Sequence, residues 1–107
     1  EERYKLLYFK NDQVSIGIGL VRRTFKLSDI REVRFSKGKQ FRSMGSWAGR
    51  MQICKLNGKT SRWIEFDGTV YYKKMVYITN EEIIDKSIDL LINEFQSRGI
   101  RCTKYRC

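Results

Sequence analysis

One long amphipathic segment near the C-terminal end, Glu81–Arg98, constrains the fold of this chain more than any other feature. Its large apolar residues recur at helical spacing and share one stripe, made of Ile84, Ile88, Leu91 and Phe95. Polar residues occupy the other positions, namely Asp85, Asp89, Asn93 and Gln96. Because a helix with one apolar stripe must bury it, we expect the upstream residues to form an open sheet that this helix covers.

Sequence signals mark both the start and the end of the predicted helix. Thr79 and Glu82 have the spacing of a capping box, in which each side chain bonds an otherwise unpaired backbone N–H. Glu81 and Arg98 lie at the helix ends whose dipole favours their charges. Gly99 follows as a C-terminal cap, so we expect the helix to span Glu81–Arg98.

Residues 1–79 read as short strands separated by turns. The seven segments rich in apolar, aromatic or β-branched residues are Arg3–Phe9, Gln13–Leu20, Arg22–Leu27, Ile30–Phe35, Arg50–Leu56, Ser61–Phe66 and Val70–Ile78. Turn residues lie between most of them, such as Lys10-Asn11-Asp12 and Ser28-Asp29. Asn57-Gly58 is the strongest hairpin signal, and this dipeptide predicts a type I′ turn with positive φ at both residues.

The strand pattern stops between the fourth and fifth segments. Ser36–Gly49 contains Lys37-Gly38-Lys39, Gly45-Ser46 and Ala48-Gly49, a composition that predicts a long loop.

At 107 residues the chain is long enough for one hydrophobic core and too short for two. We therefore predict a single α+β domain that is mainly β: a seven-stranded, partly open antiparallel barrel over residues 1–79, a capping helix over 80–98 and a basic tail over 99–107. That tail is either disordered or adds a strand.

The segment Phe25–Phe35, with sequence Phe-Lys-Leu-Ser-Asp-Ile-Arg-Glu-Val-Arg-Phe, resembles a segment common in bacterial pleckstrin-homology (PH)-like domains. There an apolar strand is followed by a Leu-Ser-Asp-Ile turn and the next strand. The order of strands, long loop, strands and capped terminal helix is also that of the PH superfold. The resemblance implies a seven-stranded partly open barrel capped by the helix, and a role in recognition rather than catalysis.

Charge divides the chain into a basic and an acidic part. The formal net charge is +10, and Lys and Arg outnumber Asp and Glu by 17 to 7 over residues 1–79. Over residues 80–98 the acidic residues prevail by 5 to 2, and the tail adds 3 basic residues and no acidic one. A split of this size favours an anionic partner, such as lipid headgroups, nucleic acid or an acidic protein. The alternative is a basic surface that only keeps the protein in solution.

Several classes of function are disfavoured by composition. The chain has no histidine, so the commonest general base and the usual partner of a nucleophilic Ser or Cys are missing, and we predict no enzyme. Three scattered cysteines without histidine disfavour zinc, and we predict neither metal nor cofactor. Glu65 and Asp67 share a strand face, where we expect ion pairs rather than catalysis. We expect reduced thiols in a cytoplasmic protein, with peripheral membrane attachment as the alternative.

The strongest candidate binding site is the stretch Arg34–Arg50, which contains no acidic residue. Its candidate ligand-binding residues are Arg34, Lys37, Lys39, Arg42, Trp47 and Arg50, interleaved with Phe41 and Met44. Cations beside exposed rings suit phosphates with stacked bases, or anionic lipid with inserted Trp and Phe. The alternative is that Phe41 and Trp47 pack onto the core. Tyr71-Tyr72-Lys73-Lys74 and the outward-facing Trp63 are weaker candidates.

Three hypotheses follow for function. The first is a non-catalytic recognition module that binds a protein or an anionic membrane surface through this basic–aromatic surface. The second is a single-stranded nucleic-acid-binding protein that stacks bases on Trp47, Phe41 and the tyrosines. The third is a structural or assembly domain that oligomerises through an exposed strand edge.

Overall fold

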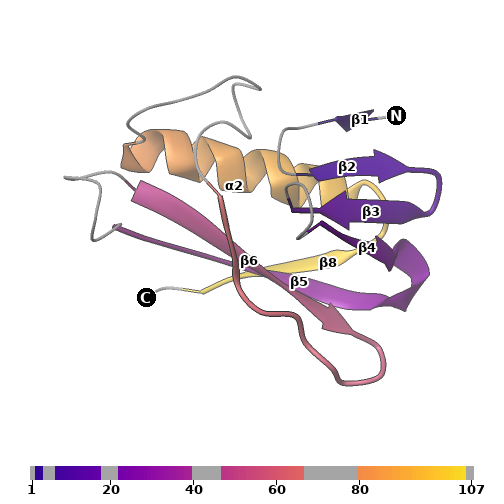
Figure 1. The fold of residues 1–107 in the computed structure, drawn as a ribbon. Helices are drawn as coiled ribbons and strands as arrows, with labels where there is room; N and C mark the ends of the chain where they lie inside the picture. The colour runs from indigo at the N-terminus through magenta and orange to yellow at the C-terminus, as the bar shows by residue number, and fades with distance from the viewer. Residues whose placement is uncertain (1, 4–6, 18–21, 40–46, 67–79, 106–107) are drawn as a thin grey trace.

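The computed structural model describes residues 2–3, 7–17, 22–39, 47–66 and 80–105, and it contains two β-sheets and a C-terminal helix (Figure 1). The strands are β1 (Glu2–Arg3), β2 (Leu7–Lys10), β3 (Gln13–Ile16), β4 (Arg23–Lys26), β5 (Ile30–Lys39), β6 (Trp47–Lys55), β7 (Ile64–Phe66) and β8 (Arg101–Lys104). A 3₁₀ turn, η2 (Leu27–Asp29), joins β4 to β5, and the helix is α2 (Glu81–Gln96). The predicted mainly β fold with one C-terminal helix is confirmed for the described residues.

Sheet A is antiparallel, with strand order β1-β2-β3-β4. The predicted single strand Arg3–Phe9 is wrong, because β1 folds back on β2 and Arg3 pairs with Tyr8. The predicted turn after Lys10 is confirmed, since Asn11 adopts a φ of 54° there. Val14 and Ile16 of β3 are buried, as their alternation predicts.

Sheet B has the order β7-β6-β5-β8 and contains one parallel pair. β5 and β6 are antiparallel over nearly their whole length, whereas β8 pairs parallel with β5. The tail therefore adds a strand, and the prediction of a purely antiparallel sheet is wrong. Among the described residues, no strand of sheet A pairs with one of sheet B, so the seven-stranded barrel is not confirmed.

The hairpin between β6 and β7 is confirmed, but its turn type differs from the prediction. Gly58 has a φ of 87° while Asn57 does not have a positive φ. The Gly58 N–H bonds the Lys55 carbonyl and the Lys55 N–H bonds the Lys59 carbonyl, at 3.1 and 2.8 Å. These bonds describe a type I turn followed by a glycine bulge, in which only the glycine needs positive φ.

β5 and β6 extend into the segment that the sequence predicts as a loop. β5 continues to Lys39 and β6 begins at Trp47, so the prediction of a loop over Ser36–Gly49 is wrong at both of its ends. A Cβ atom at Gly49 would overlap the Phe66 ring on β7, so this glycine permits close packing inside a strand. Residues 40–46 lie outside the described part of the chain.

The helix buries the predicted stripe between the two sheets. Ile84, Leu91 and Phe95 are fully buried and Ile88 nearly so. The Phe95 ring lies 5.2 Å from that of Phe9 in sheet A and 6.4 Å from that of Phe35 in sheet B, measured between centroids. The C-terminal half of α2 thus joins both sheets in one core, and Figure 1 shows it running behind β2 and β3.

The two caps of α2 differ in how well the sequence predicted them. The N-cap is Asn80, whose side chain accepts a bond of 2.8 Å from the Ile83 N–H, so the predicted Thr79–Glu82 capping box is wrong. Thr79 itself lies outside the described residues. At the other end Gly99 has a φ of 82°. The Gly99 N–H donates to the Gln96 carbonyl, and the Ile100 N–H donates to the Phe95 carbonyl. These bonds form a Schellman motif, which confirms the predicted glycine cap.

Candidate functional site

The predicted site residues whose side chains the structure describes lie on opposite faces of sheet B, because these residues belong to strands rather than to a loop. Side chains alternate between the two faces of a strand. Lys37 lies on the face covered by α2, as does Trp47, whereas Arg34 and Arg50 lie on the far face. Only the backbone of Lys39 is described, and Arg42, Phe41 and Met44 lie outside the described residues, as do Tyr71–Lys74. The structure therefore brings together Lys37 and Trp47 but not the whole predicted set.

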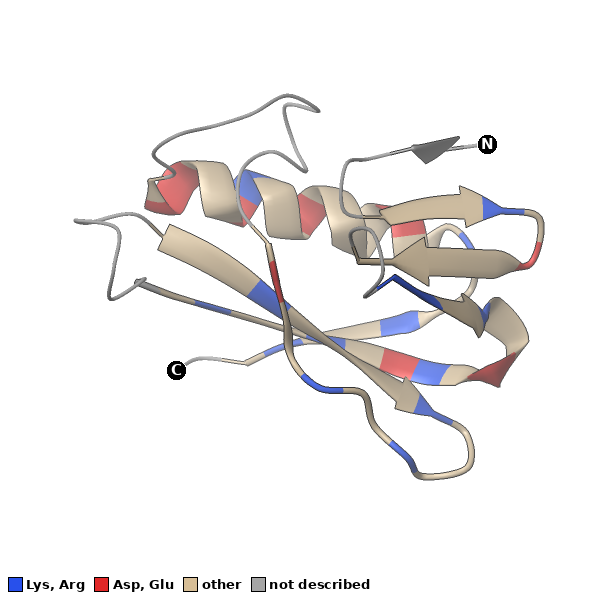
Figure 2. Cartoon of the chain, in the orientation of Figure 1, with Lys and Arg blue, Asp and Glu red and all other residues tan. Residues whose placement is uncertain are grey.

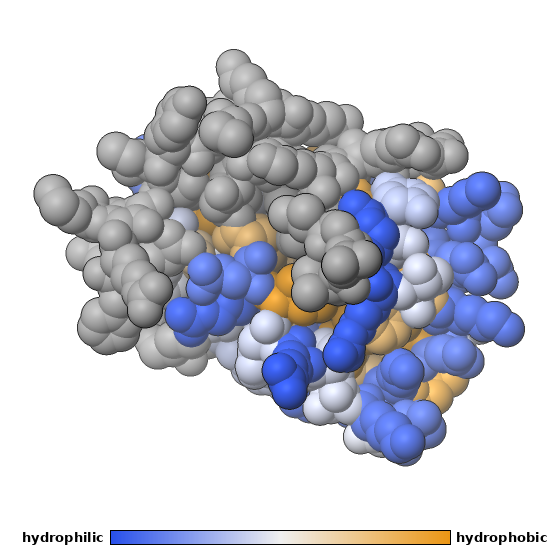
Figure 3. All heavy atoms as spheres, viewed as in Figure 1, coloured by the Kyte–Doolittle hydropathy of each residue, from blue (hydrophilic) through white to orange (hydrophobic). Residues whose placement is uncertain are grey.

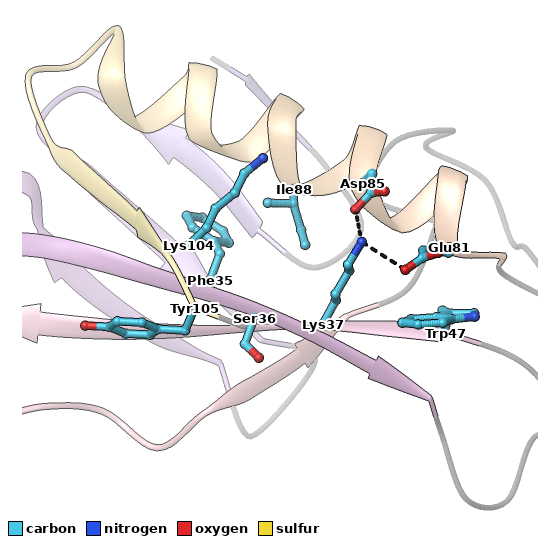
Figure 4. Close-up of a pocket in the computed structure, with 9 residues that line it drawn as sticks. All are labelled: Phe35, Ser36, Lys37, Trp47, Glu81, Asp85, Ile88, Lys104 and Tyr105. Carbon is cyan, nitrogen blue, oxygen red and sulfur yellow. Dashed lines mark hydrogen bonds and ion pairs between the residues drawn. The ribbon is translucent and has the colours of Figure 1, made fainter. Parts of the chain in front are cut away.

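Lys37 and Trp47 line a cleft of about 620 Å³ between the N-terminal half of α2 and sheet B (Figure 4). We call it the helix–sheet cleft. Its lining residues are Phe35, Ser36, Lys37, Trp47, Glu81, Asp85, Ile88, Lys104 and Tyr105. They come from α2, from β5 and β6, and from the end of β8 with the residue that follows it. The walls are partly aromatic or aliphatic, and charged groups of both signs project into the space between them.

Lys37 crosses the cleft from β5 to the helix. Its Nζ donates to Asp85 Oδ1 at 2.7 Å and lies 3.1 Å from Glu81 Oε2. The hydrogen bond to Asp85 is the main reason that the pKa of Lys37 is raised above its ordinary value. The same Nζ lies 5.8 Å from the centroid of the Trp47 ring, within cation–π range. A lysine that the sequence placed in an acid-free segment is thus paired with two carboxylates of the helix.

The other end of the cleft is also charge-balanced. Lys104 of β8 donates to Asp89 Oδ1 at 2.9 Å, and both side chains are well exposed. Tyr105 follows β8 and is 41% exposed. Figure 2 shows the origin of this balance, with carboxylates along α2 and cations across the strands of sheet B. The helix–sheet cleft therefore offers apolar surface with both charge signs, not a purely cationic surface.

The far face of sheet B carries ion pairs as well. Arg34 Nε lies 3.4 Å from Glu32 Oε1, and its guanidinium lies over the Tyr105 ring at 5.5 Å. Thr103 donates to Glu32 Oε2 at 3.0 Å, and this bond contributes most to lowering the pKa of Glu32. Arg50 Nε lies 3.7 Å from Glu65 Oε2, which agrees with the predicted ion pairing of Glu65.

A second crevice lies between the two sheets and was missed by the sequence analysis. Its volume is about 290 Å³, and it is lined by Ile16, Gly17, Arg23, Ser61, Arg62, Trp63 and Ile64. None of these described lining residues is acidic, and Trp63 is 44% exposed, as predicted for its outward face. Figure 3 shows apolar surface among strongly hydrophilic side chains on the face turned to the viewer. Arg23 and Arg62 are far apart in sequence, so only the packing of the two sheets brings them together.

The described residues offer no cluster typical of metal-dependent catalysis. No group of three or more His, Cys, Asp or Glu among them could hold a metal ion. Cys54 is buried and Cys102 is half-buried; both are free, and burial raises the pKa of the Cys102 thiol to about 11. In the part of the chain that the structure describes, no helix has the length and apolar composition to cross a membrane.

No protein-family model, curated protein or solved structure matches this chain.

Proposed function

We propose that this chain is a non-catalytic recognition domain that binds a segment of a partner protein in the helix–sheet cleft. One observation carries the proposal: a half-buried Trp47 ring and charged groups of both signs converge in a space of about 620 Å³. Binding sites typically combine apolar and aromatic walls with a few placed polar groups. Trp is also among the residues that contribute most at protein interfaces.

Charge balance favours a polypeptide over a polyanion in this cleft. A lipid or nucleic-acid phosphate approaching Lys37 would also meet Glu81 and Asp85, each about half exposed. A polypeptide segment can place an apolar side chain against Trp47 and exchange ion pairs with either sign of charge. The absence of histidine from the chain supports a binding role rather than acid–base catalysis.

We also propose that the domain is a relative of the PH superfold and works in the cytoplasm. Support for the first statement is the order of strands before a C-terminal helix, with Phe25–Phe35 forming the end of β4, η2 and the start of β5. The seven-stranded barrel stays a prediction, since the described residues form two four-stranded sheets. Free thiols at Cys54 and Cys102 are typical of a reducing compartment, which supports the second statement.

The proposal is tested with peptides selected from a random displayed library on the wild-type domain. Trp47→Ala should weaken their binding about tenfold or more, equivalent to about 1.4 kcal/mol. The matched control is Trp63→Ala, which removes an indole outside the cleft and should change affinity less than about twofold. Asp85→Lys, at a half-exposed site, is a second cleft variant that should also weaken peptide binding. Thermal unfolding checks that this variant is folded. Peptides that bind wild type, Trp47→Ala and Asp85→Lys equally well would exclude the cleft as the site.

A second candidate function rests on the crevice between the sheets. Arg23 and Arg62 line it beside the exposed Trp63, with no acidic residue among the described lining residues. Such a constellation suits phosphate groups of an anionic membrane or of single-stranded nucleic acid. Binding to phosphatidylserine vesicles or to oligothymidylate should then fall with Arg23→Ser and Arg62→Ser. Lys59→Ser, an exposed cation on the β6–β7 turn, is the control. Equal losses in all three variants would indicate net charge alone.

A further inference from the structure

β5 is longer than the strand that pairs with it on the side opposite β6. β5 spans Ile30–Lys39, but β8 pairs only with Glu32–Phe35. The last bond of this ladder runs from the Tyr105 N–H to the Phe35 carbonyl at 2.7 Å. Figures 1 and 4 show β5 continuing past the end of β8. Beyond that point, no described residue pairs with β5 on this side.

The backbone N–H and C=O groups of Lys37 and Lys39 lie on this side of β5, beyond the end of β8. We call this stretch the β5 edge. Successive residues of a strand direct their N–H and C=O groups to alternate sides. Since Phe35 bonds Tyr105 on the β8 side, Lys37 and Lys39 direct their backbone groups to the same side. The intervening residues Ser36 and Gly38 pair with β6 instead. No described residue bonds the groups of Lys37 and Lys39 on this side, and strand groups without a partner are a template for another strand.

The β5 edge borders the helix–sheet cleft. A strand added beside Ser36–Lys39 would turn alternate side chains into the cleft, toward Trp47 and Ile88. The remaining side chains would lie on the far face of sheet B, where Arg34 and Arg50 are found. The ion pairs of these arginines are partly exposed and long, 3.4 Å from Glu32 and 3.7 Å from Glu65. The Arg50–Glu65 pair is the more exposed of the two and contributes little free energy, so an added carboxylate can share Arg50.

We propose that the β5 edge at Ser36–Lys39 binds an extended segment of a partner protein, with alternating apolar and acidic residues, as an added strand. The inference rests on the proposed function, because it uses the same cleft and names the class of partner. Apolar side chains enter the cleft, acidic side chains face the arginines, and backbone bonds to Lys37 and Lys39 provide the affinity. A second copy of the chain is disfavoured as the occupant, because each copy has a net charge of +10.

The first test compares peptides that differ only in their backbone. The parent probe is a short peptide of alternating Val and Glu, and two derivatives carry N-methyl groups on the Val amides or on the Glu amides. An added strand bonds β5 through one of these amide sets and directs the other to solvent. We therefore expect one derivative to bind about tenfold or more weakly and the other to bind like the parent. A peptide of alternating Val and Lys should bind more weakly than the parent.

The second test removes the edge-facing donors of the protein. Lys37→Pro lacks the N–H that faces the edge, and proline is tolerated on the open side of a strand. Lys37→Ala is the matched control, because it also lacks the lysine side chain but keeps the N–H. The Pro variant should bind the Val–Glu peptide about tenfold more weakly than the Ala variant. Lys39→Pro and Lys39→Ala form an independent pair, and thermal unfolding shows which variants are folded.

Three results would overturn strand addition. They are equal binding of both N-methylated peptides, equal binding of the Pro and Ala variants, and no binding of the Val–Glu peptide at all. A concentration-dependent dimer that Lys37→Pro abolishes would assign the edge to a second copy and would also overturn the proposal. None of these results affects the loss of library-selected peptides in Trp47→Ala, so the proposed function is tested separately.

Discussion

The two ends of α2 belong to the same helix but have different surroundings. Near its C-terminal end, Phe95 is fully buried and contacts Phe9 of sheet A. Near its N-terminal end, Glu81 and Asp85 are about half exposed and reach Lys37 across the helix–sheet cleft. One end therefore packs against both sheets, while the other lies beside a space of about 620 Å³ that the described side chains line.

This difference separates stability from binding within one helix. Buried apolar contacts, such as those of Phe95 with both sheets, contribute much of the free energy that holds the helix in place. Exposed ion pairs at the N-terminal end contribute little, so they can be exchanged for contacts with a partner. Binding surfaces are commonly drawn from the less stable regions of a domain. The following substitutions test whether the two ends differ in this way.

The largest effect on stability is expected at Phe95. Phe95→Ala should lower the free energy of unfolding by about 3–5 kcal/mol, because it leaves a cavity between the two sheets. Denaturant unfolding measures this loss. Gln96→Ala, an exposed neighbour, should change the same quantity by less than about 0.5 kcal/mol. Similar values for the two variants would mean that the C-terminal end is not the packed end.

A smaller loss is expected at the cap that ends the helix. Gly99→Ala should cost about 1–2 kcal/mol of unfolding free energy, because a Cβ is strained at a φ of 82°. Gly38→Ala is the matched control, since a Cβ there meets no atom within 4 Å and its φ lies outside the left-handed region. If both substitutions had the same effect, the Schellman motif would contribute no more to stability than an ordinary glycine position.

The smallest effect on stability is expected in the cleft. Lys37→Met removes both ion pairs to the helix, yet it should change the unfolding free energy by less than about 1 kcal/mol, because the partners are half exposed. Thermal unfolding at low and high salt measures this change. A loss as large as that of Phe95→Ala would show that the N-terminal end depends on Lys37 for its structure.

The sequence predicted the packed end of the helix well because its signals are local. The spacing of Ile84, Ile88, Leu91 and Phe95 determines which face is apolar, and Gly99 supplies the positive φ of the cap within the same turn. The N-cap was assigned one residue too early, to Thr79 rather than Asn80, since both residue types accept such bonds.

The cleft end could not be predicted because its causes are not local. Gly49 lies in a strand with the Phe66 ring packed against it, a contact that no pattern within Ser36–Gly49 indicates. Once β5 and β6 extend through this segment, strand alternation sends Lys37 to one face of the sheet and Arg34 to the other. The pairing of Lys37 with Asp85 joins residues 48 positions apart. Local composition contains no signal for such a contact.

The central claim is that the N-terminal end of α2 and the adjoining part of β5 form the recognition site. Its most direct test is a titration of the domain with a library-selected peptide, followed by amide and indole chemical shifts. We predict that the shifts of Lys37, Asp85 and the Trp47 indole change most, while those around Phe95 stay constant. Changes centred on Arg23, Arg62 and the Trp63 indole, with a silent cleft, would contradict this assignment.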